Sequence, residues 1–149
     1  MASNVNCRNA MIDYEKFQKS LEHLQVQYEN YSTLEDSQPE LIQEAVKESV
    51  IQRFETCYDC MWKVLKRYLT EEFGIPETPN SPKPVFRLAH ENQLMRSPVE
   101  QWLIYADTRT DTAHDYSGEK AENALQLMED FIDDAIGLYQ TMTEKTWGS

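Results

Sequence analysis

The stretch from Glu40 to Phe73 contains neither glycine nor proline, and it limits the fold more than any other part of the chain. Because both residues weaken a helix interior, a run this long without them favours one uninterrupted helix. Gly74 and Pro76 follow at once and are typical residues for ending it. Apolar residues recur at helical spacing in a broad stripe, so this helix is predicted to be the central one. The predicted stripe consists of Ala45, Ile51, Phe54, Tyr58, Met61, Trp62, Leu65, Tyr68 and Leu69.

Three other long segments also have helical patterns. From Asp13, a candidate N-cap, apolar residues recur at steps of three and four, as on one face of a bundle helix. Ser97, Pro98 and Glu100 match a capping box and predict the start of the next long helix. The last long helix is predicted over residues 117–145, and one of its faces is strongly acidic.

A proline-rich break at residues 76–84 separates the two halves of the chain, and residues 83–94 predict one short helix. Four long helices, one short helix and short turns predict an all-α fold, an up-and-down four-helix bundle with an additional short helix. A length of 149 residues fits one domain. We expect a flexible N-terminus at 1–12 and a single bundle domain at 13–147.

The formal net charge of −12 argues against nucleic-acid binding by the surface as a whole, because an acidic protein repels phosphates at long range. Any RNA would need a local basic patch. The candidates for such a patch are Lys83, Arg87, Arg96 and Arg109.

The three cysteines are an odd number without the spacing of a disulfide framework. Cys57 and Cys60 are three residues apart, but no second ligand pair follows at zinc-site spacing, so ordinary structural thiols are expected. We find no signal peptide and no apolar run of membrane length. The sequence therefore predicts a soluble cytoplasmic protein without contact to a membrane.

Three reactive side chains, Arg109, His114 and Tyr116, lie within eight residues of each other. The Thr-Asp-Thr sequence at 110–112 is unfavourable inside a helix, so the helix is expected to end or bend here. Arg109 would then lie on the last turn, with His114 just beyond it, and the two could converge. A structural interpretation stands beside this one: Arg109 stabilises the helix dipole, and His114 caps carbonyl groups.

Glu55 lies at the edge of the central stripe, one turn before Tyr58. A carboxylate placed there usually reaches water, but it can also pair with a buried arginine. We expect Glu55 to pair with Arg109 and to hold it in position. Arg87 and His90, three residues apart on the short helix, fit a solvated pair, and Arg87 is also a candidate supporting residue.

Three stretches in order resemble the HEPN-type nucleotidyltransferase substrate-binding proteins, which accompany minimal nucleotidyltransferases and are similar to the helical C-terminal domain of kanamycin nucleotidyltransferase. Residues 50–69 resemble the signature long helix of that family, and residues 81–102 resemble its short-helix region. Arg109-x4-His114-x-Tyr116 resembles the motif that names its catalytic members. Thr110 departs from the asparagine that commonly follows the motif arginine, and a threonine hydroxyl reaches less far than an amide.

The resemblance implies a homodimer whose Arg/His segments face each other, either alone or within a hetero-oligomer with a minimal nucleotidyltransferase. It also implies a toxin-type endoribonuclease that uses no metal or other cofactor, with Arg109, His114 and Tyr116 as catalytic residues and Tyr116 as the residue that the partner adenylylates. The broad stripe, with Trp62 and Trp102 on neighbouring helices, favours the homodimer as well.

Two functions stay open from the sequence. The first is this ribonuclease, with Glu55 and Arg87 in substrate-binding or supporting roles. The alternative is a non-catalytic module that binds the substrate of the nucleotidyltransferase. No glycine-serine loop followed by paired aspartates is present, so no nucleotidyltransferase activity of its own is expected.

Overall fold

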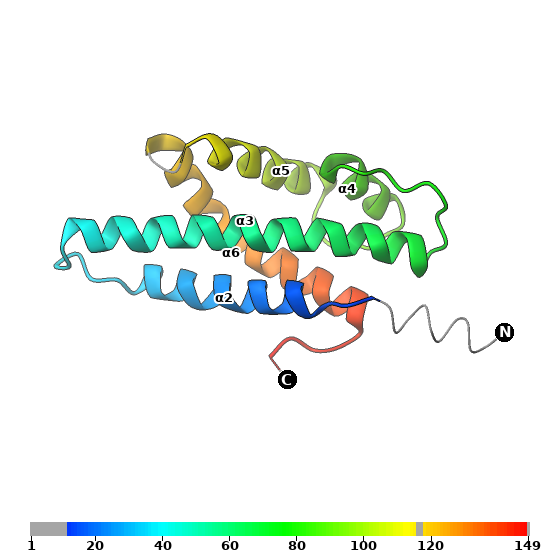
Figure 1. The fold of residues 1–149 in the computed structure, drawn as a ribbon, viewed down its shortest axis with the longest axis horizontal. Helices are drawn as coiled ribbons and strands as arrows, with labels where there is room; N and C mark the ends of the chain where they lie inside the picture. Colours follow the sequence, from blue (N-terminus) through cyan, green and yellow to red (C-terminus); the bar gives the residue numbers. More distant parts are fainter. Residues whose placement is uncertain (1–11, 116–117, 149) are drawn as a thin grey trace.

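A computed structural model describes residues 12–115 and 118–148, and these form five helices without a β-strand (Figure 1). The long helices α2, α3, α5 and α6 run alternately up and down, and the short helix α4 lies on the connection from α3 to α5. The predicted all-α four-helix bundle with an additional short helix is confirmed. The bounds are α2 Glu15–Ser32, α3 Glu40–Glu71, α4 Pro82–Glu91, α5 Val99–His114 and α6 Gly118–Thr143.

Helix α3 is the centre of the fold, because it packs against all four other helices. Most of its predicted stripe is buried, but Ala45 is exposed, and Trp62 and Tyr68 are only half-buried. The prediction for Ala45 was wrong because the buried part of α3 begins at Val50, and the helix before it extends past the packed core. The buried apolar residues of α3 are Val50, Ile51, Phe54, Cys57, Tyr58, Met61, Val64, Leu65 and Leu69.

The start of α2 and the end of α6 lie at the same end of the bundle. Asp13 accepts a hydrogen bond from the backbone N–H of Glu15 at 2.9 Å, although the residue at the N-cap position is Tyr14. Ile12 belongs to the core, whereas residues 1–11 lie outside the described residues, so a flexible N-terminus stays a prediction.

In the described part of the chain, every helix is too short or too polar to cross a membrane.

The start of α5 is held by α6 rather than by a capping box. The hydroxyl of Ser97 donates to Asp134 Oδ1 at 2.5 Å, and the hydroxyl of Tyr105 donates to Asp134 Oδ2 at 2.6 Å. Pro98 occupies the N-cap position, and no side chain caps the helix there. The predicted capping box was wrong because the Ser97 hydroxyl donates its hydrogen bond to the carboxylate of Asp134 on α6 instead of capping α5.

The end of α5 also differs from the prediction, because the helix continues through residues 110–112 to His114. The hydroxyl of Thr110 donates to the carbonyl of Ala106 at 3.2 Å, one turn back in the same helix. Thr112 is 1% exposed, and its hydroxyl reaches Glu55 on α3 at 2.8 Å. Because both hydroxyls have partners that are compatible with a helix, neither competes for the backbone.

The core contains a chain of edge-to-face aromatic rings across α3, α5 and α6. The ring of Phe131 lies 4.9 Å from that of Phe54 and 5.1 Å from that of Tyr105. Trp102 lies 5.4 Å from Tyr105 and is 1% exposed. Trp102 therefore belongs to the core of one chain, and the expected homodimer stays a prediction.

Candidate functional site

A groove of about 650 Å³ opens between α3, the start of α4 and the second half of α5. Ala106, Arg109, Thr110 and Ala113 lie on one face of α5 because they recur at steps of three and four, and His114 follows at the end of the helix. These residues line the groove together with Arg87 from α4. The structure therefore brings three of the predicted site residues, Arg87, Arg109 and His114, to one place.

Arg109 is held by two carboxylates from α3. Its Nη1 lies 3.1 Å from Glu55 Oε2, so the contact expected from the sequence is present. Its Nε and Nη2 also donate to the two oxygens of Asp59, at 3.2 Å and 3.1 Å. Glu55 and Asp59 are four residues apart, which places both on one face of α3. This bidentate geometry fixes the guanidinium plane as well as its charge.

Asp59 was not predicted. The four-residue spacing from Glu55 was its only signal in the sequence. Thr112 was not predicted either, and its hydroxyl shares Glu55 Oε2 with Arg109. The Glu55 side chain is 11% exposed and that of Arg109 is 26% exposed. The pair is therefore mostly shielded from water, while part of Arg109 still reaches the groove.

His114 is the last residue of α5 and is exposed at the groove. The expected convergence of Arg109 and His114 on one site is present, but a continuous helix produces it rather than a break after Arg109. Tyr116 lies outside the described residues.

Cationic side chains outnumber carboxylates among the described residues that line the groove. Lys83, Arg87 and Arg109 line it, and Asp59 is the one carboxylate among the described lining residues. Lys83 also forms an ion pair at 2.6 Å with Asp107 outside the groove. Of the predicted basic patch, Arg96 lies elsewhere, because its side chain runs past Gly137 on α6.

Tyr58 and Trp62 give the groove an aromatic side next to these charges. Tyr58 is 2% exposed, and burial, reinforced by the carboxylate of Asp59, raises the pKa of its hydroxyl. The phenol therefore stays neutral at physiological pH. Trp62 is half-buried, and its ring is available to contact a ligand face.

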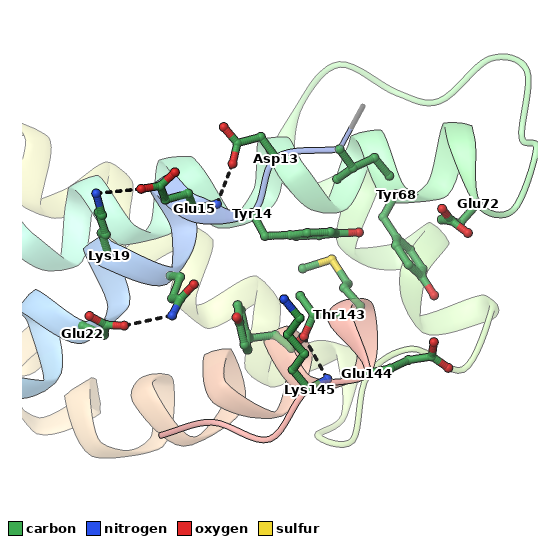
Figure 2. Close-up of a pocket in the computed structure, with 14 residues that line it drawn as sticks. Asp13, Tyr14, Glu15, Lys19, Glu22, Tyr68, Glu72, Thr143, Glu144 and Lys145 are labelled. Atoms are coloured by element: carbon green, nitrogen blue, oxygen red, sulfur yellow. Dashed lines mark hydrogen bonds and ion pairs between the residues drawn. The ribbon is translucent and has the colours of Figure 1, made fainter. Parts of the chain in front are cut away.

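A second, larger cavity of about 830 Å³ lies where α2 begins and where α3 and α6 end (Figure 2). Five carboxylates and two lysines line it, and Lys19 is bound to Glu15 at 2.7 Å. Figure 2 shows Tyr14 and Tyr68 among these charges. Burial raises the pKa of both hydroxyls, and the negative charge of Glu72 raises it further. Such a lining repels phosphate groups, so the groove at Arg109 is the better candidate for an anionic substrate.

The chain belongs to the family described as nucleotidyltransferase substrate binding protein like, whose model matches residues 12–144. The family assignment made from the three sequence stretches is thereby confirmed.

Individual relatives agree with this assignment. The probable ribonuclease HepT of Haemophilus influenzae is 28% identical over 116 residues, which are 74% of this chain and 76% of that protein. A Thermus thermophilus protein of known crystal structure is 30% identical, with a TM-score of 0.70 over 85% of this chain and 98% of that one. A Haemophilus influenzae structure, reported to reveal the fold of a substrate binding domain of a nucleotidyltransferase, is 26% identical, with a TM-score of 0.71 over 93% and 98%.

Proposed function

We propose that this chain is the helical partner of a separate minimal nucleotidyltransferase and that its groove is a metal-independent ribonuclease site. The observation that carries the proposal is the meeting of Arg109 and His114 in a locally basic groove of a chain whose net charge is −12. The similarity to HepT of Haemophilus influenzae, a probable ribonuclease, supports the same activity. We place the protein in the cytoplasm, where RNA and such a partner are found.

The groove offers the parts that RNA cleavage needs. A phosphate can be bound by Arg109 and Arg87, whose guanidinium groups stabilise the negative charge that develops on its oxygens. Histidine is the side chain best suited to exchange protons near neutral pH. In the proposed step the ribose 2′-oxygen attacks phosphorus, its proton leaves to a base, the bond to the 5′-oxygen breaks, and that oxygen receives a proton. The products are a 2′,3′-cyclic phosphate and a free 5′-hydroxyl, with His114 as the proton-transfer group.

The carboxylates of Glu55 and Asp59 have a positioning role in this proposal. They hold Arg109 by its Nε and both Nη atoms, so the guanidinium does not have to be ordered when the substrate binds. Thr110 lines the groove beside it and donates to the carbonyl of Ala106. The departure from the asparagine of the family motif therefore leaves this helical turn intact.

Two further parts of the proposal come from the family resemblance. The first is a homodimer that faces two grooves towards each other, for which sedimentation at micromolar concentration should give twice the mass of one chain. The second is adenylylation of Tyr116 by the nucleotidyltransferase. An adenylyl group two residues from His114 would bring a phosphodiester charge and bulk to the groove and would block an RNA phosphate. With partner and ATP, wild type should gain adenylyl mass, and Tyr116→Phe should gain none.

One observation favours the alternative, a non-catalytic module that only binds the substrate of the nucleotidyltransferase. The charge of Arg109 is already compensated by two carboxylates, as in a purely structural cluster. A module of this kind would bind the nucleotidyltransferase but leave RNA intact.

RNA cleavage in the presence of a chelator separates the two functions. Protein verified as unmodified by mass spectrometry should cut single-stranded RNA and leave a 2′,3′-cyclic phosphate. The same sequence with 2′-deoxyribose at the cleaved position should resist, since it lacks the attacking oxygen. Intact RNA after incubation with unmodified protein would reject the ribonuclease and leave the binding module.

A further inference from the structure

A second basic groove lies between α2 and α3. It has a volume of about 350 Å³ and is lined by Lys16, Lys19 and His23 from α2 and by Arg53 from α3. Among the described lining residues there is no carboxylate. This is unexpected in a chain with 26 acidic and 14 basic residues, because a random surface site would contain more acids than bases.

The charges of this groove are largely uncompensated. Lys19 is paired with the exposed Glu15 at 2.7 Å. Within residues 12–115 and 118–148, no ion pair or hydrogen bond engages the side chains of Lys16, His23 or Arg53. All three residues are exposed. An anionic ligand would meet their cationic groups without first displacing a carboxylate.

The second groove flanks the same stretch of α3 as the candidate active site. Cys60 lines the second groove, whereas its chain neighbour Asp59 lines the groove of Arg109. Lys63, one turn after Cys60 and exposed, extends the positive charge along the ridge between them. Only the width of one helix, about 10 Å, therefore separates the two basic grooves.

We infer that the α2–α3 groove is a phosphate-binding site for single-stranded RNA whose cleaved phosphate lies at Arg109 and His114, so that the strand crosses α3 at Lys63. This inference rests on the proposed ribonuclease function and extends it. Cationic grooves that track a flexible backbone are the usual means of holding single strands without reading their sequence. Such a path also explains how RNA approaches a protein with a charge of −12, since it needs only this face.

The test is the salt dependence of RNA binding, measured in a His114→Ala background so that the RNA stays intact. The double variant Lys16→Gln/Arg53→Gln removes two cations from the second groove and none from the candidate active site. The matched control Lys120→Gln/Lys145→Gln removes the same charge from exposed positions on and just after α6. Each phosphate contact with single-stranded RNA contributes about 0.7 to the slope of log Kd against log salt.

The double variant should lower that slope by about 1.4. The ratio of its Kd to the Kd of the parent should therefore fall about 25-fold when the salt concentration is raised tenfold. The control pair should keep the slope of the parent. Equal slopes for the two double variants would overturn the inference, as would a parent that does not bind RNA. RNA cleavage is measured separately in protein with native His114. If no cleavage occurs but the two double variants still differ in slope, the ribonuclease function is rejected and RNA binding in the second groove stands.

Discussion

Arg109 is partly shielded from water, and its guanidinium plane is held by hydrogen bonds to Glu55 and Asp59. Its partners come from consecutive turns of α3, and one of them, Glu55, is also bound by Thr112. A cation held in this way keeps its orientation when the groove is empty. Pre-ordering of this kind lowers the entropic cost of positioning a residue that binds a phosphate.

Replacing Glu55 by glutamine should lower the free energy of unfolding by about 1–3 kcal/mol, between the values for an exposed and a buried ion pair, because Asp59 still compensates Arg109. Urea denaturation measures this change. The control Glu48→Gln, an exposed position on the same helix, should be close to neutral. Equal losses of stability for the two variants would show that the contacts of Glu55 with Arg109 and Thr112 do not stabilise the fold.

The contact between Glu55 and Arg109 could be predicted because Glu55 sits at the edge of an apolar stripe, where a carboxylate needs a partner. The role of Asp59 could not be predicted, because an aspartate on the polar side of a helix normally faces water. The expected helix break at 110–112 was wrong for a tertiary reason. Thr112 finds its partner on α3, and no local propensity contains that information.

Helix α5 owes its placement to α6 as much as to its own sequence. Asp134 accepts hydrogen bonds from Ser97, ahead of the helix, and from Tyr105, two turns into it. These contacts fix the position of α5 along α6. They therefore also fix where Arg109 and His114 lie along the axis of α3.

Asp134→Ala should lower the free energy of unfolding by about 2 kcal/mol or more, because it leaves two partly buried hydroxyls without their acceptor. Asp133→Ala, one residue earlier and exposed, is the matched control and should change stability by less than about 0.5 kcal/mol. Urea unfolding of both variants measures the difference. A cost for Asp134→Ala no larger than that of the control would mean that solvent replaces these bonds.

The long helices were predictable because runs without glycine or proline leave few alternatives. The start of α3 at Glu40 matches the prediction, and its end at Glu71 lies two residues before the expected one. The start of α5 was less predictable. A serine before a proline satisfies the local rule for a cap, and only the fold brings the competing carboxylate of Asp134 close to it.

Charge is distributed unevenly over the whole molecule. Two basic grooves flank the middle of α3, whereas five carboxylates and only two lysines line the cavity at the end of the bundle in Figure 2. The sequence predicts the total charge but not this separation, since the lining residues of each groove come from distant segments. The candidate basic patch was therefore correct for Lys83, Arg87 and Arg109 and wrong for Arg96.

Stability should fall steeply in alkaline solution. Burial raises the pKa of Tyr58, Tyr105 and Cys57 in the folded chain. The folded state therefore keeps protons that the unfolded state releases, so its stability is fully present at neutral pH and declines once pH exceeds about 9, near the ordinary values of these groups. Urea unfolding between neutral pH and about pH 11 measures the decline. Tyr105→Phe should make it shallower, and stability that is independent of pH above about 10 would contradict this account.

The most direct test of the site is the rate of RNA cleavage by wild type, His114→Ala and His90→Ala, each unmodified and in the presence of a chelator. His90 is exposed on α4 and does not line the groove, so its replacement controls for the loss of a surface histidine. We predict that His114→Ala lowers the rate by about 10²–10⁴-fold, the usual contribution of a general acid or base, while His90→Ala keeps the rate of wild type. Equal rates for wild type and His114→Ala, with the fold intact, would contradict the assignment of this groove as the active site.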